Sequence, residues 1–100
     1  MVLLATIIVG KQAYGAAIRQ KLHEIVGRDV SVGALYATME RLESKGFVES
    51  RMGEATAKRG GRAKRYFAVT GQGKQALSKA RDAMNSLWQH VSLSSHLQTI

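Results

Sequence analysis

The chain of 100 residues has no cysteine and no proline, few aromatic residues, and only 7 acidic residues against 15 basic ones. Without cysteine, a disulfide scaffold, a thiolate nucleophile and a cysteine-ligated zinc site are all excluded, and this composition fits a cytoplasmic protein. Without proline, glycine becomes the main signal for where helices and strands end. The shortage of acidic residues leaves a formal net charge of +8, so charge alone indicates a polyanionic partner.

Long apolar runs are also missing. The apolar opening segment, Met1–Val9, is too short to cross a bilayer and lacks the positive flank of a signal peptide. We therefore expect a core helix and no membrane partner. No capping residue precedes this segment, which indicates either a helix that begins upstream of Met1 or a trimmed N-terminus.

Catalytic and metal-binding motifs are incomplete. His23 and Glu24 resemble the start of a zinc-protease helix, but Gly27 stands where the second histidine is required. The other two histidines, His90 and His96, cannot share a helical face well with His23. We expect no enzymatic activity, no metal and no cofactor.

Hydrophobic periodicity predicts three helices in the first half of the chain. The first covers Met1–Val9, and the second carries apolar residues at helical spacing from Tyr14 until it ends at Gly27. The third runs from the capping residue Ser31 to Lys45 and ends at Gly46, a residue suited to left-handed backbone. Its buried stripe consists of Leu35, Met39 and Leu42.

Two short strands and a long helix follow. The strands, Val48–Met52 and Lys64–Val69, suit a hairpin with a loop over residues 53–63, and Thr70 is placed to cap the last helix. This order predicts a mainly α (α+β) fold, a winged helix-turn-helix with a two-stranded β wing and a C-terminal dimerisation helix. We assign residues 1–70 to the DNA-binding domain and 71–100 to the dimerisation helix and a tail that frays after residue 91.

The third helix is the candidate recognition helix. Small side chains at its leading end let its backbone approach base edges in a major groove about 12 Å wide. The same face could instead pack on another protein helix. Tyr36 has two interpretations, a phosphate contact through its hydroxyl or an ordinary residue at the core edge. The predicted DNA contacts from this helix are Ser31, Gly33, Ala34, Tyr36, Ala37, Thr38 and Arg41.

The loop between the strands is the second candidate. From Arg51 to Arg65 there are six basic residues and one acid, Glu54, so this stretch holds a net +5 of the total +8. Solvated surfaces usually mix charges, whereas a loop of one sign suits a phosphate backbone or a minor groove. The predicted DNA contacts here are Lys58, Arg59, Arg62 and Lys64.

The last helix carries an apolar seam at alternating spacings of three and four, which is typical of helix pairing. Together with the apolar N-terminal segment it supplies more hydrophobic surface than one small domain can cover, which favours a homodimer. The predicted interface residues are Leu3, Leu4, Ile7, Leu77, Ala80, Met84, Leu87, Trp88 and Val91.

The sequence from about Tyr14 to about Gly73 resembles the PadR family of bacterial transcriptional regulators. Val32, Ala34 and Phe67 depart from the family pattern, so base preference cannot be transferred. The resemblance is carried by Tyr14, Gly15, Ile18, Ser31, Gly33, Leu35, Tyr36, Arg41, Leu42, Glu43, Gly46 and Val48, and by Gly61, Arg62, Tyr66, Thr70 and Gly73.

The resemblance implies a homodimer in which the C-terminal helix packs on the partner's N-terminal helix, and a repressor that binds a palindromic operator in double-stranded DNA. It also implies a possible site for a small aromatic effector at Trp88, although a hydrophobic core anchor is the interpretation we favour for this residue. The alternative function is a winged-helix module that docks an acidic protein partner.

Overall fold

The computed structural model describes residues 1–53 and 64–91. In chain order the elements are α1 (Val2–Val9), the 3-10 turn η1 (Gly10–Gln12), α2 (Gly15–Val26), α3 (Val32–Ser44), β1 (Val48–Met52), β2 (Arg65–Val69) and α4 (Gly71–Gln89). The predicted mainly α fold with one two-stranded sheet is confirmed. The predictions for the loop and for the fraying tail lie outside the described residues.

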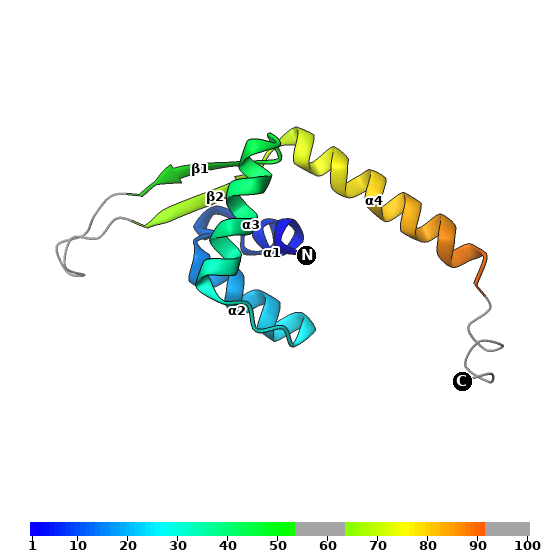
Figure 1. The fold of residues 1–100 in the computed structure, drawn as a ribbon, viewed down its shortest axis with the longest axis horizontal. Helices are drawn as coiled ribbons and strands as arrows, with labels where there is room; N and C mark the ends of the chain where they lie inside the picture. The colour runs from blue at the N-terminus through cyan, green and yellow to red at the C-terminus, as the bar shows by residue number, and fades with distance from the viewer. Residues whose placement is uncertain (54–63, 92–100) are drawn as a thin grey trace.

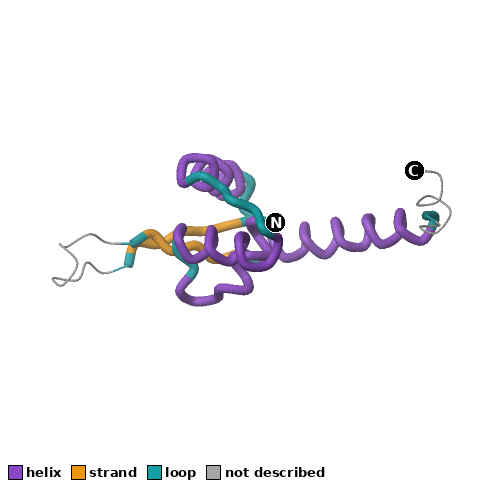
Figure 2. The backbone as a smooth tube through the Cα atoms, turned by 90° about the horizontal axis from the view of Figure 1, so that it is seen from below, coloured by secondary structure: helices purple, strands orange, loops and turns teal. Residues whose placement is uncertain are grey.

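Helices α1 to α3 and the β1–β2 hairpin pack together, whereas α4 extends away from them (Figures 1 and 2). Only the first two turns of α4 touch this body: Gly73 is buried, and Leu77 packs on the edge of the core. From Ser78 to Val91 every residue is exposed. The core consists of Leu3, Ala5, Ala13, Ile18, Leu22, Leu35, Met39, Val48 and Phe67.

The ends of α2 and α3 follow the predicted signals. Gly27 caps α2 with a left-handed φ of 66°, and the Ser31 side chain accepts a hydrogen bond of 3.1 Å from the Ala34 N–H. At the other end of α3, Gly46 has a φ of 80° and the Phe47 N–H donates to the Leu42 carbonyl oxygen at 2.9 Å. These bonds fix where the candidate recognition helix begins and ends.

The segment before α2 differs from the prediction. Tyr14 is not helical but extended, because it lies along the free edge of β2 and pairs with Tyr66. The Phe67 N–H donates to the Ala13 carbonyl oxygen at 2.8 Å, so residues 13–14 are joined to the outer edge of β2 by an isolated bridge. Likewise β2 begins at Arg65, one residue later than expected.

Replacing Ser31 with alanine is expected to lower the free energy of unfolding by about 1 kcal/mol, because the Ala34 N–H in the first turn of α3 loses its side-chain acceptor. Urea denaturation measures this difference. Ser31→Asp retains an acceptor and is expected to stay close to wild type. Equal stability of the wild type and Ser31→Ala would show that the cap contributes nothing.

Two further observations concern membranes and metals. Over the described ranges, 1–53 and 64–91, no helix combines the length and apolarity needed to cross a bilayer. In the same ranges, no three histidine, aspartate or glutamate side chains are grouped so that they could hold a metal ion.

Candidate nucleic-acid interface

The outer face of α3 begins with small, exposed side chains. Leu35 and Met39 are completely buried, which turns the opposite side of the helix toward solvent. A Cβ added at Gly33 would meet no atom within 4 Å, so the first turn is unobstructed. The predicted contact residues Ser31, Gly33, Ala34, Ala37 and Arg41 are all exposed, and Thr38 is half-buried.

An apolar residue that the sequence reasoning did not include also lies on this first turn. Val32 is 51% exposed, although valine is usually buried. Its position directly after the cap, at the leading end of α3, is suited to an apolar contact with a thymine methyl group in the major groove. The one feature of the sequence that could have drawn attention to Val32 was its departure from the family pattern.

Further along the same helix, Arg41 and Thr38 interact. The Arg41 Nη2 atom donates a hydrogen bond of 3.2 Å to the Thr38 hydroxyl. This bond holds the exposed guanidinium against the helix surface. A guanidinium held in this way loses less rotamer freedom when it binds a base edge or a phosphate.

Tyr36 packs inward with its ring. The ring centroid lies 5.9 Å from that of Phe67, and the two planes are tilted by 56°. Its hydroxyl lies against Gly15, where an added Cβ would come within 2.9 Å of the oxygen. The residue therefore sits at the core edge, with its hydroxyl at the N-terminus of α2.

The hairpin formed by β1 and β2, with its connecting residues, is called the wing. Its paired strands carry stacked cations at the end nearest the connecting residues, at Arg51 and Lys64, and this end is called the wing root. The Lys64 Nζ atom lies 4.0 Å from the Tyr14 ring centroid, and the Arg51 guanidinium lies 4.8 Å from the Tyr66 centroid. The two tyrosine rings meet edge to face at 6.0 Å. Lys64, a predicted DNA contact, is thus held by an aromatic platform.

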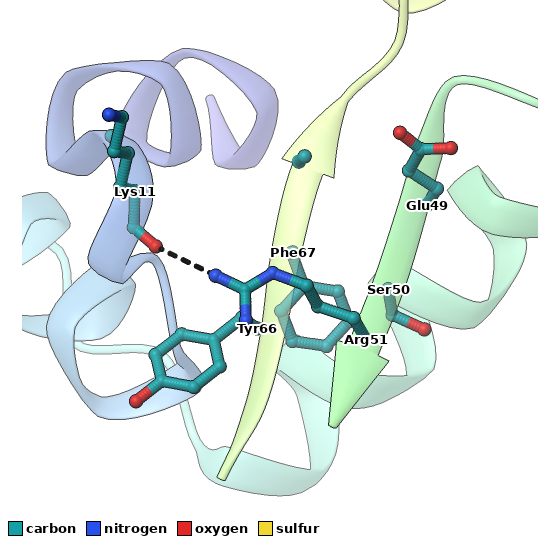
Figure 3. A pocket seen from close by; sticks show the side chains of 8 residues that line it. Lys11, Glu49, Ser50, Arg51, Tyr66 and Phe67 are labelled. Carbon is teal, nitrogen blue, oxygen red and sulfur yellow. Dashed lines mark hydrogen bonds between the residues drawn. The ribbon is translucent and has the colours of Figure 1, made fainter. Parts of the chain in front are cut away.

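Figure 3 shows the Arg51 side chain beside Tyr66 and its 3.5 Å hydrogen bond to the Lys11 carbonyl oxygen. These residues border a hollow of about 490 Å³ between η1 and the strands. The bond and the stack tie the wing root to the segment before α2. The other predicted wing contacts, Lys58, Arg59 and Arg62, lie outside the described residues.

Glu43 connects α3 to both strands, an arrangement that sequence reasoning missed. Its Oε1 atom forms a 2.9 Å ion pair with Arg65 Nη2, and its Oε2 atom accepts a 2.7 Å hydrogen bond from the Ser50 hydroxyl. Arg65 Nη2 also donates to the Ser50 hydroxyl at 3.2 Å. These partners are separated by 7 to 22 residues along the chain, so no short-range pattern could indicate the contact.

Most predicted interface residues expose apolar surface away from α3 and the wing. Leu3 requires a correction: it is only 9% exposed and belongs to the core, so it offers little surface to a partner. Trp88 is 50% exposed and is therefore not the core anchor that we favoured, at least within a single chain. Leu77 is half-buried, and the remaining exposed positions are Leu4, Ile7, Ala80, Met84, Leu87 and Val91.

A second apolar surface lies between α1 and the end of α2. It surrounds a hollow of about 140 Å³ lined by Met1, Leu4, Ile8 and other residues of the two helices. Ile25 and Val26, on the α2 side, are 59% and 49% exposed. Sequence reasoning did not assign these two residues to any interface.

Comparisons with known proteins agree with this geometry. Residues 3–79 match the transcriptional regulator PadR-like family. A protein named Transcriptional regulator Rv3488, from Mycobacterium tuberculosis (strain ATCC 25618 / H37Rv), is 35% identical over 80 residues, which cover 80% of this chain and 70% of that protein.

Solved structures share the fold. A PadR-like transcription factor from Bacteroides fragilis superposes with a TM-score of 0.73 at 24% identity, over 96% of this chain and 86% of that one. A PadR family transcriptional regulator from Eggerthella lenta DSM 2243 gives a TM-score of 0.70 at 23% identity, over 97% and 83% of the two chains. The family match over residues 3–79 and the 35% identity to a named regulator establish that this chain belongs to the PadR-like family of transcriptional regulators, which confirms the resemblance and the expectation of a non-enzymatic function.

Proposed function

We propose that this regulator acts as a repressor that binds a palindromic operator as a homodimer, with α3 in the major groove and the wing on the adjacent backbone. The observation that carries the proposal is the small, unobstructed first turn of α3, together with a wing root where cations are held on aromatic rings. A face of this shape and charge fits duplex DNA.

The proposed roles of the two elements differ. The first turn of α3, with Val32, Gly33 and Ala34, approaches base edges, while Arg41 offers a positioned guanidinium to a guanine or a phosphate. The stretch of the wing from Arg51 to Arg65 holds a net +5 of the total +8 and binds phosphates without reading sequence. The hydroxyl of Tyr36, at the start of α2, contacts a phosphate.

The proposed dimer explains the exposed apolar surfaces. In each chain the outer part of α4 is exposed, with Leu87 at 66%, and the hollow between α1 and α2 is open. Packing α4 of one chain on α1 and α2 of the other would cover both surfaces. A two-fold dimer of this kind presents its two recognition helices about 34 Å apart, one turn of DNA.

The proposed dimer also places the exposed Trp88 near the subunit interface. A flat aromatic effector that stacks on this indole would favour one arrangement of the two subunits over another. Release of the operator would follow if the favoured arrangement changed the distance between the two recognition helices.

Operator selection followed by salt titration tests the proposal. Oligonucleotides selected from a random pool define the operator, and log affinity is expected to fall with log salt by about 0.9 for each phosphate contact. Arg59→Ala with Arg62→Ala should weaken all duplexes alike and reduce this slope, whereas Thr38→Ala should change sequence preference. Binding that does not depend on salt would contradict the proposal and favour an acidic protein as the partner.

A further inference from the structure

We infer that Glu43 is a positioning residue whose carboxylate holds the wing at a fixed orientation relative to α3, so that both reach the same duplex together. The inference rests on the proposed function, because it assigns Glu43 and its partners a role in operator recognition. It concerns an acidic residue on a surface otherwise suited to a polyanion.

Both carboxylate oxygens of Glu43 are engaged, one by the Arg65 guanidinium and the other by the Ser50 hydroxyl. Arg65 also donates to the Ser50 hydroxyl, so Glu43, Arg65 and Ser50 are bonded to one another in a triangle. The side chains of Arg65 and Glu43 are only 30% and 36% exposed, so water screens this pair less than a fully exposed one. Three elements, α3, β1 and β2, therefore meet at one carboxylate.

The location of the triangle decides what it controls. Ser50 belongs to the middle pair of the hairpin register, with Phe67, and Arg65 belongs to the last pair, with Met52, so the triangle spans the half of the paired strands nearest the connecting residues. The Arg65 guanidinium also lies 5.1 Å from the Phe67 ring centroid.

The recognition helix shares a buried core with the hairpin, Leu35 and Met39 packing with Val48 and Phe67, and two further contacts join them at separate places. In its first half, the Tyr36 ring packs on Phe67, and in its last turn Glu43 binds Arg65 and Ser50. The contact at the far end of α3 restrains the angle between the helix and the hairpin more than the apolar packing does by itself. Loss of the Glu43 contact would leave the wing attached to α3 through the apolar core.

Charge and positioning predict opposite effects for Glu43. By charge alone, removing an acid from a DNA-binding surface should strengthen binding to every duplex. If the carboxylate positions the wing, its removal should weaken operator binding, because α3 and the wing no longer reach their contacts together. Charge and positioning also predict different roles for Arg65. By charge alone Arg65 would bind a phosphate, whereas as the partner of Glu43 it is not a phosphate contact.

The experiment uses the full chain and compares the wild type with Glu43→Ala, Glu43→Gln, Arg65→Ala and the double alanine variant. Affinity is measured for the selected operator and for a random duplex over a range of salt concentrations. Each single alanine variant should lower the operator-to-random ratio about tenfold, and the double variant should lower it no further, since one interaction is lost in all three. The salt dependence should match that of the wild type.

Glu40→Ala and the Glu43→Gln variant serve as controls. Glu40→Ala removes the same charge from an exposed position one turn earlier on α3, so it should leave the operator-to-random ratio unchanged. Glu43→Gln keeps an acceptor for Ser50 and should recover part of the ratio lost in Glu43→Ala. This variant also carries the test if Glu43→Ala does not fold.

Three results would overturn the inference, and they are distinguishable. If both Glu43→Ala and Glu40→Ala bind every duplex more tightly, Glu43 acts through charge alone, and the proposed function stands. If Arg65→Ala weakens operator and random DNA equally and reduces the salt slope by about 0.9, Arg65 is a phosphate contact. If the wild type binds no duplex DNA, the proposed function itself fails and the inference fails with it.

Discussion

Replacing Gly73 with alanine should destabilise this protein by about 3 kcal/mol or more, because the space for a side chain is filled by backbone. A Cβ built at Gly73 would overlap the Phe47 carbonyl oxygen and lie 2.8 Å from a methyl group of Val69. The Phe47 oxygen cannot move away freely, since it accepts a 3.0 Å hydrogen bond from the Thr70 N–H.

The Gly73 contact lies where the wing is joined to α4. The Thr70 hydroxyl accepts a hydrogen bond from the Gly73 N–H and donates one to the Gly46 carbonyl oxygen, at 3.0 and 2.6 Å. A side chain at residue 73 would push α4 away from the end of α3 and break these bonds. We therefore expect the variant to lose stability and to change the direction in which α4 leaves the body.

Thermal unfolding measures the loss, and Gly71→Ala is the matched control. Gly71 lies two residues earlier in the same helix turn, with no atom within 4 Å of an added Cβ. Alanine there should be neutral or stabilising by about 0.5–1 kcal/mol, because glycine loses more conformational freedom on folding. The midpoint for Gly73→Ala should fall by roughly 12 °C or more. Similar midpoints for the two variants would show that the backbone accommodates the added methyl.

Leu87→Ala is expected to weaken the proposed dimer strongly while changing the single chain little. Leu87 is 66% exposed in the chain alone, and truncating an exposed side chain typically changes stability by less than about 0.5 kcal/mol. If α4 packs on a partner, the same truncation removes a buried leucine and costs on the order of 2–5 kcal/mol. The difference between these two values tests the dimer directly.

Sedimentation equilibrium and the concentration dependence of the melting temperature measure this effect. A loss of about 2.8 kcal/mol would raise the dimer dissociation constant roughly 100-fold and make melting depend more steeply on protein concentration. Ser86→Ala, whose side chain is turned about 100° around the same exposed helix from Leu87, should change neither quantity. A dimer of unaltered strength in Leu87→Ala would place the interface elsewhere.

Much of the candidate site could be predicted because its signals are local. The cap at Ser31, the left-handed Gly46 and the spacing of Leu35 and Met39 each act over a few residues, and together they fix both ends and the buried side of α3. The exposed face then follows by elimination. The contacts at the wing root could not be predicted in this way, because stacking of Lys64 on Tyr14 depends on how distant segments meet.

The same distinction explains the errors. The helix α1 is apolar around most of its circumference, so periodicity could not distinguish the buried Leu3 from the exposed Leu4. Tyr14 carried a helical spacing that was overruled by pairing with the edge of β2. Trp88 lies on a helix whose residues 78–91 are all exposed, so its hydrophobicity gave no information about its surroundings.

By itself, the sequence determined the order of helices and strands, the ends of the recognition helix and the concentration of positive charge in the wing. Each of these depends on neighbours along the chain or on composition. The tertiary structure decided which apolar residues are buried, how Gly73 fits beneath Phe47, and that Glu43 joins α3 to both strands through Arg65 and Ser50. These features depend on the packing of segments that are far apart in sequence, where a single ångström separates a contact from a clash.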